Sequence, residues 1–474
     1  MSDVYDWRAF EDYAHGVMER QQIPGMAVAV TREGEVCFQR GFGFRDREEG
    51  LKVSEDTVFG IASVTKSFTG VLILQLAREG LLSLTDPVVK HLPELAPRKD
   101  LSQAQVHHFL THSSGLAPLP SLIGAMARSL EKDETMGDRW EEMKKVEPLD
   151  TPEELMSYIV DSDLDPLGPP GTVFSYSNDC FALLGTIVER LTGRSFEAAV
   201  RERILEPLGM DSTTVDLEGA GLPEVTTLYT RKGTGAERET VRSPLWWESP
   251  AMEAAGFLRS SASDLLKYLE MLRGLGAGGE GRVLEVTDTL NMMTPQIEYF
   301  PGVGYGYGFR VQPDYRGFSL VEHSGGLKGV SSHVLLFPDA GVTAVALCNV
   351  DDAPTDTVAL AGANVALRLP MGSRRHPRRD YQYPVEHLEK FVGVYHSTEG
   401  ISPPARVVVD GDRLVIRRED QEDRVEFMGP HTFQVFFRPE DEEGKPGRFL
   451  VDSQGHVYGA LMGSRVIYRK PLDE

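Results

Sequence analysis

Cysteine is scarce in this sequence, and long apolar runs are absent from it. The three cysteines, Cys37, Cys180 and Cys348, are widely separated and sit beside apolar residues, which argues against a disulfide framework or a zinc site. Buried free thiols fit a reducing compartment. No apolar run approaches the roughly 20 residues that span a bilayer, and the charged N-terminus lacks the apolar core of a signal peptide. We therefore expect a cytoplasmic protein with no membrane partner.

Positive charge is also in short supply. There are 49 Lys and Arg residues against 72 Asp and Glu residues, which gives a formal net charge of −23. Such a field repels polyphosphate, so we expect no nucleic-acid partner. The G-x-G-x-x-G match over residues 276–281 follows a helical pattern instead of a strand, and the adjacent His107 and His108 lack the spacing of metal ligands. We therefore expect no cofactor and no metal.

The first three quarters of the chain read as one mixed domain. The length of 474 residues exceeds the roughly 100–200 of one typical domain. Apolar spacing predicts a helix over residues 7–18 and a strand hairpin over 26–39, and strand signals return over 305–350. Strands at both ends with helices between them predict an α+β domain over residues 1–372, whose antiparallel sheet takes strands from both of its ends. The charged stretch 118–150 fits either a lid or helical insertion over a site, or a surface excursion.

The end of the chain differs from the preceding domain in its charge and in its hydrophobic pattern. The basic segment 373–384 breaks the acidic trend and is interpreted as an exposed linker. Residues 385–474 contain about eight short strand patterns and almost no helical period, and Asp410-Gly411 between two β-rich runs is a strong hairpin signal. We therefore expect a small antiparallel β-barrel of eight strands over residues 385–474.

The sharpest chemical motif is Ser63-Val64-Thr65-Lys66. A serine and a lysine at positions i and i+3 share one face of a helix, and an amphipathic run begins directly after them. In a first helical turn the backbone N–H groups and the macrodipole favour developing negative charge. A serine hydroxyl needs a base within reach to act as a nucleophile, and a lysine amine can serve if its pKa is depressed. The spacing alone is common and equally fits an exposed helix start.

Two further motifs contain polar groups that suit a reaction site. Tyr176-Ser177-Asn178 lies between a short strand and a helix, where a phenol can exchange protons and an amide can donate and accept, although Asn178 or Asp179 could simply cap the helix. His323-Ser-Gly-Gly326 follows a strand, and glycines there let a backbone N–H approach a ligand closely. An ordinary glycine-rich turn with an exposed histidine is the alternative for that motif.

The three motifs in this order resemble the serine β-lactamase and penicillin-binding-protein family, whose signature is S-x-x-K, then Y-x-N or S-x-N, then K-T-G or H-x-G on a strand. Segments 81–88, 110–116, 205–211 and 255–265 also look like family segments. The resemblance covers roughly residues 7–365 and is closest to the class C β-lactamase-like branch, which includes D-aminopeptidases, D,D-carboxypeptidases and esterases. The tail resembles the lipocalin-like domains attached to some of these peptidases.

The resemblance implies three catalytic residues. Ser63 is expected to be the nucleophile that forms an acyl-enzyme, and Lys66 to activate it and shuttle protons. Tyr176 is expected to be a second proton relay, acting on the leaving group or on the water that removes the acyl group.

The resemblance also implies a substrate-binding set. Asn178 is expected to anchor a substrate amide, and the H-x-G strand contributes His323, Gly325 and Gly326. The backbone N–H groups of Ser63 and Gly326 are expected to form the oxyanion hole, a contribution of typically a few kcal/mol per donor.

One departure from the family pattern bears on the substrate. His323 stands where many members have lysine, which removes a permanent cation that usually meets a substrate carboxylate. This puts efficient β-lactam hydrolysis and D,D-carboxypeptidase action in doubt. Outside the motifs, we expect His112 to organise its Thr-His-Ser-Ser-Gly turn, while Tyr305 or Tyr307 could line the cleft.

The leading hypothesis is therefore a serine peptidase or amidase that acts on small molecules or short peptides with a D-amino acid near the scissile bond. A carboxylesterase using the same serine is the runner-up, and a β-lactamase is the third alternative. A degenerate hydrolase that only binds a ligand or partner is the alternative from another class. A homo-oligomer is compatible with each of them.

Overall fold

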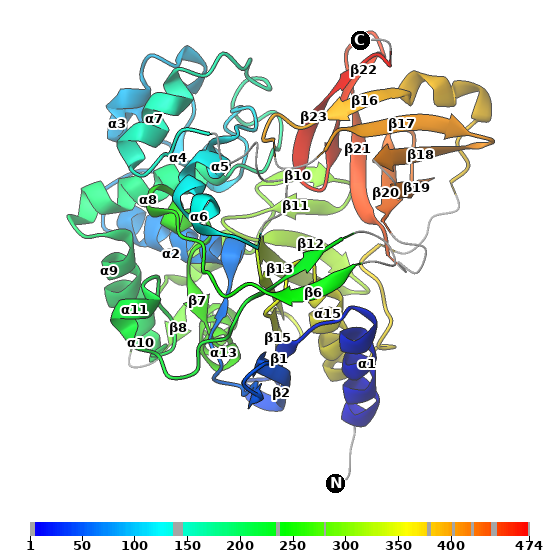
Figure 1. Cartoon of the computed structure of the whole chain (residues 1–474). Helices are drawn as coiled ribbons and strands as arrows, with labels where there is room; N and C mark the ends of the chain where they lie inside the picture. The colour runs from blue at the N-terminus through cyan, green and yellow to red at the C-terminus, as the bar shows by residue number, and fades with distance from the viewer. Residues whose placement is uncertain are drawn as a thin grey trace.

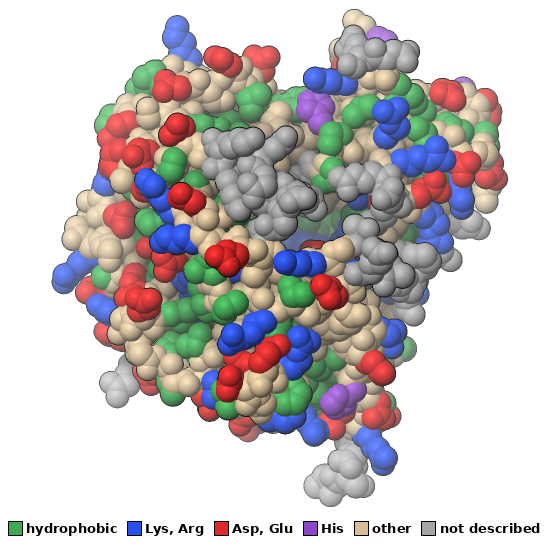
Figure 2. Space-filling view, viewed as in Figure 1, with side chains coloured by type: hydrophobic (Ala, Val, Ile, Leu, Met, Phe, Trp, Pro, Cys, Tyr) green, Lys and Arg blue, Asp and Glu red, His purple; other side chains and the backbone are tan. Residues whose placement is uncertain are grey.

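The computed structural model describes residues 5–135, 146–233, 238–278, 281–376, 381–400, 403–418, 421–437 and 443–472. It contains a large α+β domain and a small β-barrel, seen at the upper right of Figure 1. On the face shown in Figure 2, Lys and Arg side chains are interspersed with Asp and Glu instead of gathering into one basic patch.

A nine-stranded antiparallel sheet is the centre of the large domain. Its order is β10-β11-β12-β13-β14-β15-β1-β2-β3, so the first strand of the chain lies beside a strand more than 300 residues later, with Met26 opposite Cys348. The prediction that strands from both ends of the domain build one sheet is confirmed. The strands are β1 (Gly25–Arg32), β2 (Glu35–Asp46), β3 (Leu51–Lys52), β10 (Ile297–Phe300), β11 (Val303–Tyr305), β12 (Arg310–Tyr315), β13 (Phe318–Leu327), β14 (Val330–Phe337) and β15 (Val342–Cys348).

Both faces of this sheet are covered by helices. Side chains alternate between the two faces of a strand. In β1, Val28 and Val30 join the apolar core under α1 (Trp7–Arg20) and α15 (Thr355–Leu367). Ala27 and Ala29 of the same strand face the larger core on the opposite side. The first predicted helix is confirmed, because Phe10, Ala14 and Val17 form its buried stripe.

The larger core lies under the helices that follow β3 and precede β10 in the sequence. Its long helices are α2 (Thr65–Arg78), α7 (Pro152–Val160), α8 (Asn178–Thr192), α13 (Ala262–Arg273) and α14 (Val286–Met292). Shorter helices are α3 (Val88–His91), α4 (Val106–Leu110), α5 (Ser121–Ala125), α6 (Ala127–Lys132), α9 (Phe196–Val200), α10 (Glu206–Leu208), α11 (Leu217–Ala220) and α12 (Glu253–Gly256). Two-residue strands and hairpins fill in between: β4 (Phe59–Gly60), β5 (Tyr229–Lys232), β6 (Glu239–Arg242), β7 (Arg259–Ser260), β8 (Ala277–Gly278) and β9 (Gly281–Arg282).

The structure describes part of the stretch 118–150 and part of the glycine-rich match at 276–281. The described portion of the stretch 118–150 includes α5 and α6, whose Ile123 and Leu130 are buried in the larger core, so this portion is a packed helical insertion. Residues 136–145 of that stretch lie outside the described residues. The glycine-rich match at 276–281 falls on the β8–β9 hairpin, apart from residues 279 and 280, which also lie outside them.

The barrel is a closed ring of eight antiparallel strands, as the sequence predicts. It closes where β16 pairs with β23, with Val394 opposite Lys470. At one end the short helix η9 (Val385–Phe391) brings Phe391 onto Phe449, with ring centroids 4.2 Å apart. The strands are β16 (Gly393–His396), β17 (Ala405–Asp410), β18 (Arg413–Arg418), β19 (Gln421–Phe427), β20 (Thr432–Phe436), β21 (Lys445–Val451), β22 (Val457–Met462) and β23 (Arg465–Lys470).

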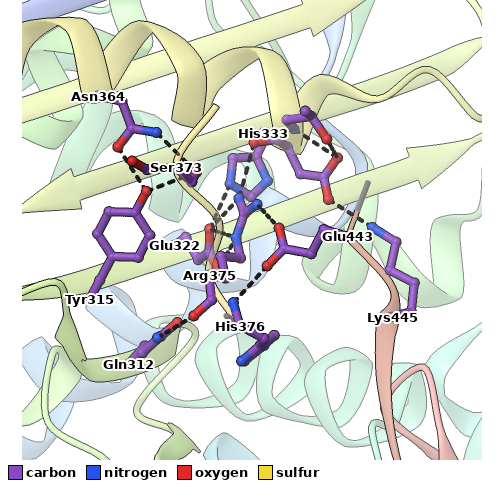
Figure 3. A network of polar contacts seen from close by, with 12 residues as sticks. Gln312, Tyr315, Glu322, His333, Asn364, Ser373, Arg375, His376, Glu443 and Lys445 are labelled. Atoms are coloured by element: carbon purple, nitrogen blue, oxygen red, sulfur yellow. Dashed lines mark hydrogen bonds and ion pairs between the residues drawn. The ribbon is translucent and has the colours of Figure 1, made fainter. Parts of the chain in front are cut away.

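The interpretation of segment 373–384 as an exposed linker is wrong for its first residues, while residues 377–380 lie outside the described part. Arg375 and His376 are buried. Figure 3 shows the reason: the Arg375 guanidinium makes a bidentate ion pair with Glu322 of β13, and Glu443 from the barrel lies beside it at 3.6 Å. Buried charge of this kind needs partners, so the segment is held against both domains. The division into residues 1–372, 373–384 and 385–474 stays a prediction.

Candidate active site

Ser63 and Lys66 meet at the start of α2. Ser63 lies in a single 3₁₀ turn, η1 (Ala62–Val64), directly before that helix. Ala62 has a positive φ of 42°, a backbone strain that typically costs about 1–3 kcal/mol and must be held in place by the surrounding contacts. Lys66 is fully buried, and its Nζ lies 3.2 Å from Ser63 Oγ. The predicted pairing of hydroxyl and amine is therefore present.

The amine of Lys66 has two further neighbours, and both are oxygens without charge. Nζ donates to Asn178 Oδ1 at 2.8 Å and to the carbonyl oxygen of Ala255 at 2.5 Å. Burial lowers the pKa of Lys66 well below the usual value for lysine, and the positive charge of Arg465 lowers it further. An uncharged amine has two N–H groups and one lone pair. In that uncharged form, with both N–H groups donated to the two oxygens, the lone pair would face the hydroxyl of Ser63.

Tyr176 covers this pair from the side. Its ring centroid lies 4.8 Å from Lys66 Nζ. Its buried hydroxyl lies near that of Ser63 without completing a well-aligned hydrogen bond to any described residue. Burial raises the pKa of Tyr176, and the Ser63 hydroxyl and the charge of Arg465 only partly oppose this rise. Tyr176 therefore holds its proton and is placed to pass it on.

Asn178 is the first residue of α8 and does not cap it. The cap is Ser177, whose hydroxyl accepts a hydrogen bond from the backbone N–H of Cys180. This leaves the Asn178 side chain to point toward Lys66. The capping alternative considered for Asn178 and Asp179 is wrong, because the serine between Tyr176 and Asn178 takes that role.

His323 is buried and neutral. Its Nδ1 lies 2.7 Å from the carbonyl oxygen of Ser324, which can only accept, so Nδ1 carries the proton and Nε2 accepts from the Tyr305 hydroxyl at 2.9 Å. Burial, followed by the nearby Lys66, lowers the pKa of His323 to about 3. The alternative of an exposed histidine is wrong, and His323 supplies no positive charge. Of the two tyrosines considered, Tyr305 reaches this group, whereas the Tyr307 hydroxyl bonds to His107.

The two glycines of the H-x-G strand have different reasons to be glycine. A Cβ on Gly325 would lie 2.1 Å from the carbonyl oxygen of Ile61, so the strand packs directly against the turn that carries Ser63. A Cβ on Gly326 would meet no atom within 4 Å, so the space beside Gly326 is open. The structure thus brings β13 and the turn that carries Ser63 together.

His112 organises its loop, as expected, and also supports Tyr176. Its Nδ1 accepts a hydrogen bond from the backbone N–H of Ser177 at 3.0 Å, and its ring centroid lies 4.2 Å from that of Tyr176. Its φ of 55° places it in the left-handed region. Burial lowers the pKa of His112 well below its usual value, so the ring is neutral.

The barrel contributes two residues that sequence reasoning missed. Arg465, the first residue of β23, stacks on Tyr176 with its guanidinium carbon 4.8 Å from the ring centroid. Its Nε lies 2.5 Å from Glu399 Oε2. The tip of the β22–β23 hairpin is fixed there, because the Tyr176 N–H donates to the carbonyl oxygen of Ser464. The short strand patterns over residues 385–474 were recognisable in the sequence, but nothing local in them indicates that this hairpin tip reaches a site nearly 300 residues earlier.

The described ranges hold no cluster of three or more His, Cys, Asp or Glu side chains arranged for a metal ion. Every helix within them is too short or too polar to cross a bilayer.

Comparison with known proteins gives relatives for most of the chain. Residues 10–367 match the beta-lactamase family. Esterase EstB of Burkholderia gladioli is 29% identical over 342 residues, which is 67% of this chain and 83% of the relative. Protein flp of Staphylococcus aureus (strain MW2) is 26% identical over 338 residues, 70% of this chain, and the match spans 61% of the length of flp.

Two solved structures extend the likeness. The octameric penicillin-binding protein homologue from Pyrococcus abyssi superposes with a TM-score of 0.69 at 27% identity, covering 98% of this chain and 100% of the other. A D-stereospecific amidohydrolase from Streptomyces sp. gives a TM-score of 0.59 at 26% identity, covering 75% and 98%. The Ser63–Lys66–Tyr176 geometry lies within the matched residues, and relatives among these proteins are hydrolases. This chain belongs to the beta-lactamase family of serine hydrolases.

Proposed function

We propose that the protein is a peptidase or amidase that acts on small peptides through an acyl-enzyme on Ser63, with a D-amino acid next to the scissile bond. The observation that carries the proposal is the environment of Lys66. Its amine lies 3.2 Å from Ser63 Oγ, and two neutral oxygens occupy its N–H groups. A buried amine in that state is a base already aimed at the nucleophile.

The reaction begins with proton transfer from Ser63 to Lys66. Oγ attacks the substrate carbonyl carbon, and the carbonyl oxygen becomes an oxyanion that the N–H groups of Ser63 and Gly326 would stabilise. The turn between β13 and β14 has two residues, with Leu327 opposite Val330. In an antiparallel hairpin bonded and non-bonded pairs alternate, so the N–H of Gly326 is expected to point away from β14. The open space beside Gly326 supports this role.

Tyr176 favours an amide substrate over an ester. Breakage of an amide needs a proton on the leaving nitrogen, whereas an alkoxide or phenoxide leaves more readily without one. The Tyr176 hydroxyl keeps its proton and has no competing partner among the described residues. We assign it to protonate the leaving group and afterwards to help deprotonate the water that releases the acyl group. The Asn178 amide group, whose oxygen is taken by Lys66, is left to bind a substrate carbonyl.

The D-stereochemistry is supported by the solved relative named as a D-stereospecific amidohydrolase. Carboxylesterase action is the second candidate, favoured by the esterase among the relatives. Homo-oligomeric assembly is part of the proposal, since the octameric homologue matches the chain over both domains.

The test is a substrate panel with Ser63→Ala as the control. We expect a fluorophosphonate to label the wild-type serine, and D-aminoacyl anilides to turn over faster than their L-isomers. Absence of labelling would contradict the enzyme proposal and favour a protein that only binds a ligand. Turnover of short-chain esters with no cleavage of any anilide would replace the amidase proposal with an esterase.

A further inference from the structure

We propose that the ion pair of the partly exposed Arg465 and the buried Glu399, which the barrel places against the catalytic groups, sets the pH at which Lys66 activates Ser63. Both are positioning residues, because they act on Lys66 through their charge and need not touch the substrate. The inference rests on the proposed function of Ser63 and Lys66. It assigns to the barrel a direct part in the chemistry of the large domain.

The Lys66 amine and the Arg465 guanidinium both lie against the ring of Tyr176. Lys66 Nζ and the Arg465 guanidinium carbon each lie 4.8 Å from the centroid of Tyr176. The two groups are therefore separated by no more than about twice that distance, in a region where Lys66 and Tyr176 are buried. At such a separation two like charges still interact appreciably, because the surrounding medium screens them far less than water does.

The pair is held in place from both sides. Ser464 accepts a hydrogen bond from the Tyr176 N–H at 2.9 Å, and the Val466 N–H donates to Ser175 Oγ at 3.3 Å, so Arg465 is fixed between two contacts to the large domain. Thr398, next to Glu399, donates to the carbonyl oxygen of Pro118. The backbone of Arg465 cannot move away from Tyr176 without breaking these contacts.

Several titratable groups surround Lys66 and act on its pKa. Burial is the largest cause of its lowered pKa, Arg465 lowers the pKa further, and Glu399 raises it. Asp179 and Cys180 on α8 also act to raise it, whereas His112 and His323 are neutral rings. Tyr176 stays protonated and uncharged. Arg465 is therefore the nearby fixed cation that opposes an ammonium at Lys66, and Glu399 partly offsets it.

Opposite charges give opposite expectations. Removal of Arg465 makes an ammonium at Lys66 easier to form, so the base is available only at higher pH. Removal of the negative charge of Glu399 makes the ammonium harder to form, so the base is available at lower pH. A pair with a purely structural role would give no such opposed shifts, because loss of either partner would loosen the same hairpin.

The experiment measures the rate constant for labelling of Ser63 by an uncharged fluorophosphonate as a function of pH. An uncharged probe avoids any direct attraction between a substrate carboxylate and Arg465. We expect Arg465→Met to move the midpoint of the profile up by about one pH unit and Glu399→Gln to move it down by a similar amount. The double variant is expected to return close to the wild-type midpoint.

Matched controls separate charge from structure. Arg465→Lys keeps the positive charge and is expected to keep the wild-type midpoint. Arg417 and Glu422 form an exposed pair at 3.0 Å in the same barrel, and Arg417→Met and Glu422→Gln are expected to shift nothing. Thermal unfolding of each variant shows that it is folded, and if Glu399→Gln does not fold, the comparison of Arg465→Met with Arg465→Lys decides.

Labelling that persists in both single variants with unchanged midpoints, or with midpoints displaced in the same direction, would overturn the inference. A wild-type protein that is not labelled at all, or a Ser63→Ala variant that is labelled equally, would instead refute the proposed function.

Discussion

Two buried lysines occupy contrasting regions of this molecule. Lys66 beside Ser63 has hydrogen bonds to neutral oxygens, and no described carboxylate lies within ion-pair distance. Lys328, in the β13–β14 turn, lies 3.0 Å from the equally buried Asp133, and Ser243 accepts further hydrogen bonds from its amine. Burial lowers the pKa of both, but Asp133 opposes the shift at Lys328.

The comparison teaches that burial of a charged residue is not by itself a sign of catalysis. The Lys328–Asp133 pair ties the β13–β14 turn to the helical insertion, and Trp247 Nε1 adds a further hydrogen bond to the same carboxylate at 2.8 Å. Its charges are neutralised in place. Lys66 has no carboxylate partner of this kind among the described residues, so we expect its burial to lower the free energy of unfolding. We assign Lys328 to structure and Lys66 to chemistry on that difference.

The largest expected effect is on activity. Lys66→Met removes the base, so we expect labelling of Ser63 and turnover of any substrate to fall by about 10³-fold or more. Lys328→Met should leave the turnover number of the folded protein within a factor of about three, because that lysine touches no reacting atom. Single-turnover kinetics on both variants measures the contrast. Equal losses in the two variants would erase the distinction between the lysines.

The second effect is on stability, and here the order of the two lysines reverses. Lys328→Met strands the carboxylate of Asp133, which we expect to lower the free energy of unfolding by about 3–5 kcal/mol. Lys66→Met strands no charge and removes a poorly solvated amine, so the free energy of unfolding should stay the same or rise near neutral pH. Urea unfolding of the two variants tests this. A Lys66→Met protein less stable than Lys328→Met would contradict it.

A third, more selective effect concerns the proton that Tyr176 carries. Tyr176→Phe should reduce cleavage of aminoacyl anilides by about 10²-fold, because the leaving nitrogen loses its proton donor. Esters with good leaving groups should be spared. The ratio of kcat/KM for matched amide and ester substrates is the measurement. Equal reduction for both would mean that Tyr176 serves the activation of Ser63, which this account assigns to Lys66.

The smallest effect is in the pH dependence of stability. Lys66 has a lower pKa when folded than when unfolded, so between those two values the unfolded chain binds more protons. Stability therefore rises as pH increases through this window, and the contribution disappears in Lys66→Met. Melting temperatures across the alkaline range compare the two proteins. A variant that keeps the wild-type slope would show that Lys66 does not have the depressed pKa.

Much of the fold was legible in the sequence because its signals are local. The stripe of Phe10, Ala14 and Val17 and the Asp410-Gly411 turn each indicate one element without help from the rest of the chain. That one sheet takes strands from both ends of the domain followed only from the positions of the strand patterns, and the pairing of β1 with β15 itself was not predicted. The linker was misjudged because charge composition alone cannot show that Glu322 and Glu443 surround Arg375.

The candidate site could also be predicted from the sequence only in part. Ser63, Lys66, Tyr176 and Asn178 lie in motifs whose spacing has a chemical reason, and the structure brings them together. The neutrality of His323 follows from burial beneath residues distant in the sequence, so it could not be read from its own motif. Arg465 enters from a different domain, and no spacing rule connects it to Tyr176.

The central claim is that Lys66 is an uncharged amine at neutral pH. Side-chain NMR of protein with labelled lysine, assigned with Lys66→Arg, can follow the titration of this group directly. The account predicts one lysine signal with the chemical shift of a neutral amine near pH 7, lost in Lys66→Arg, while Lys328 remains an ammonium. A Lys66 signal that stays that of an ammonium until the pH at which free lysine titrates would contradict the claim.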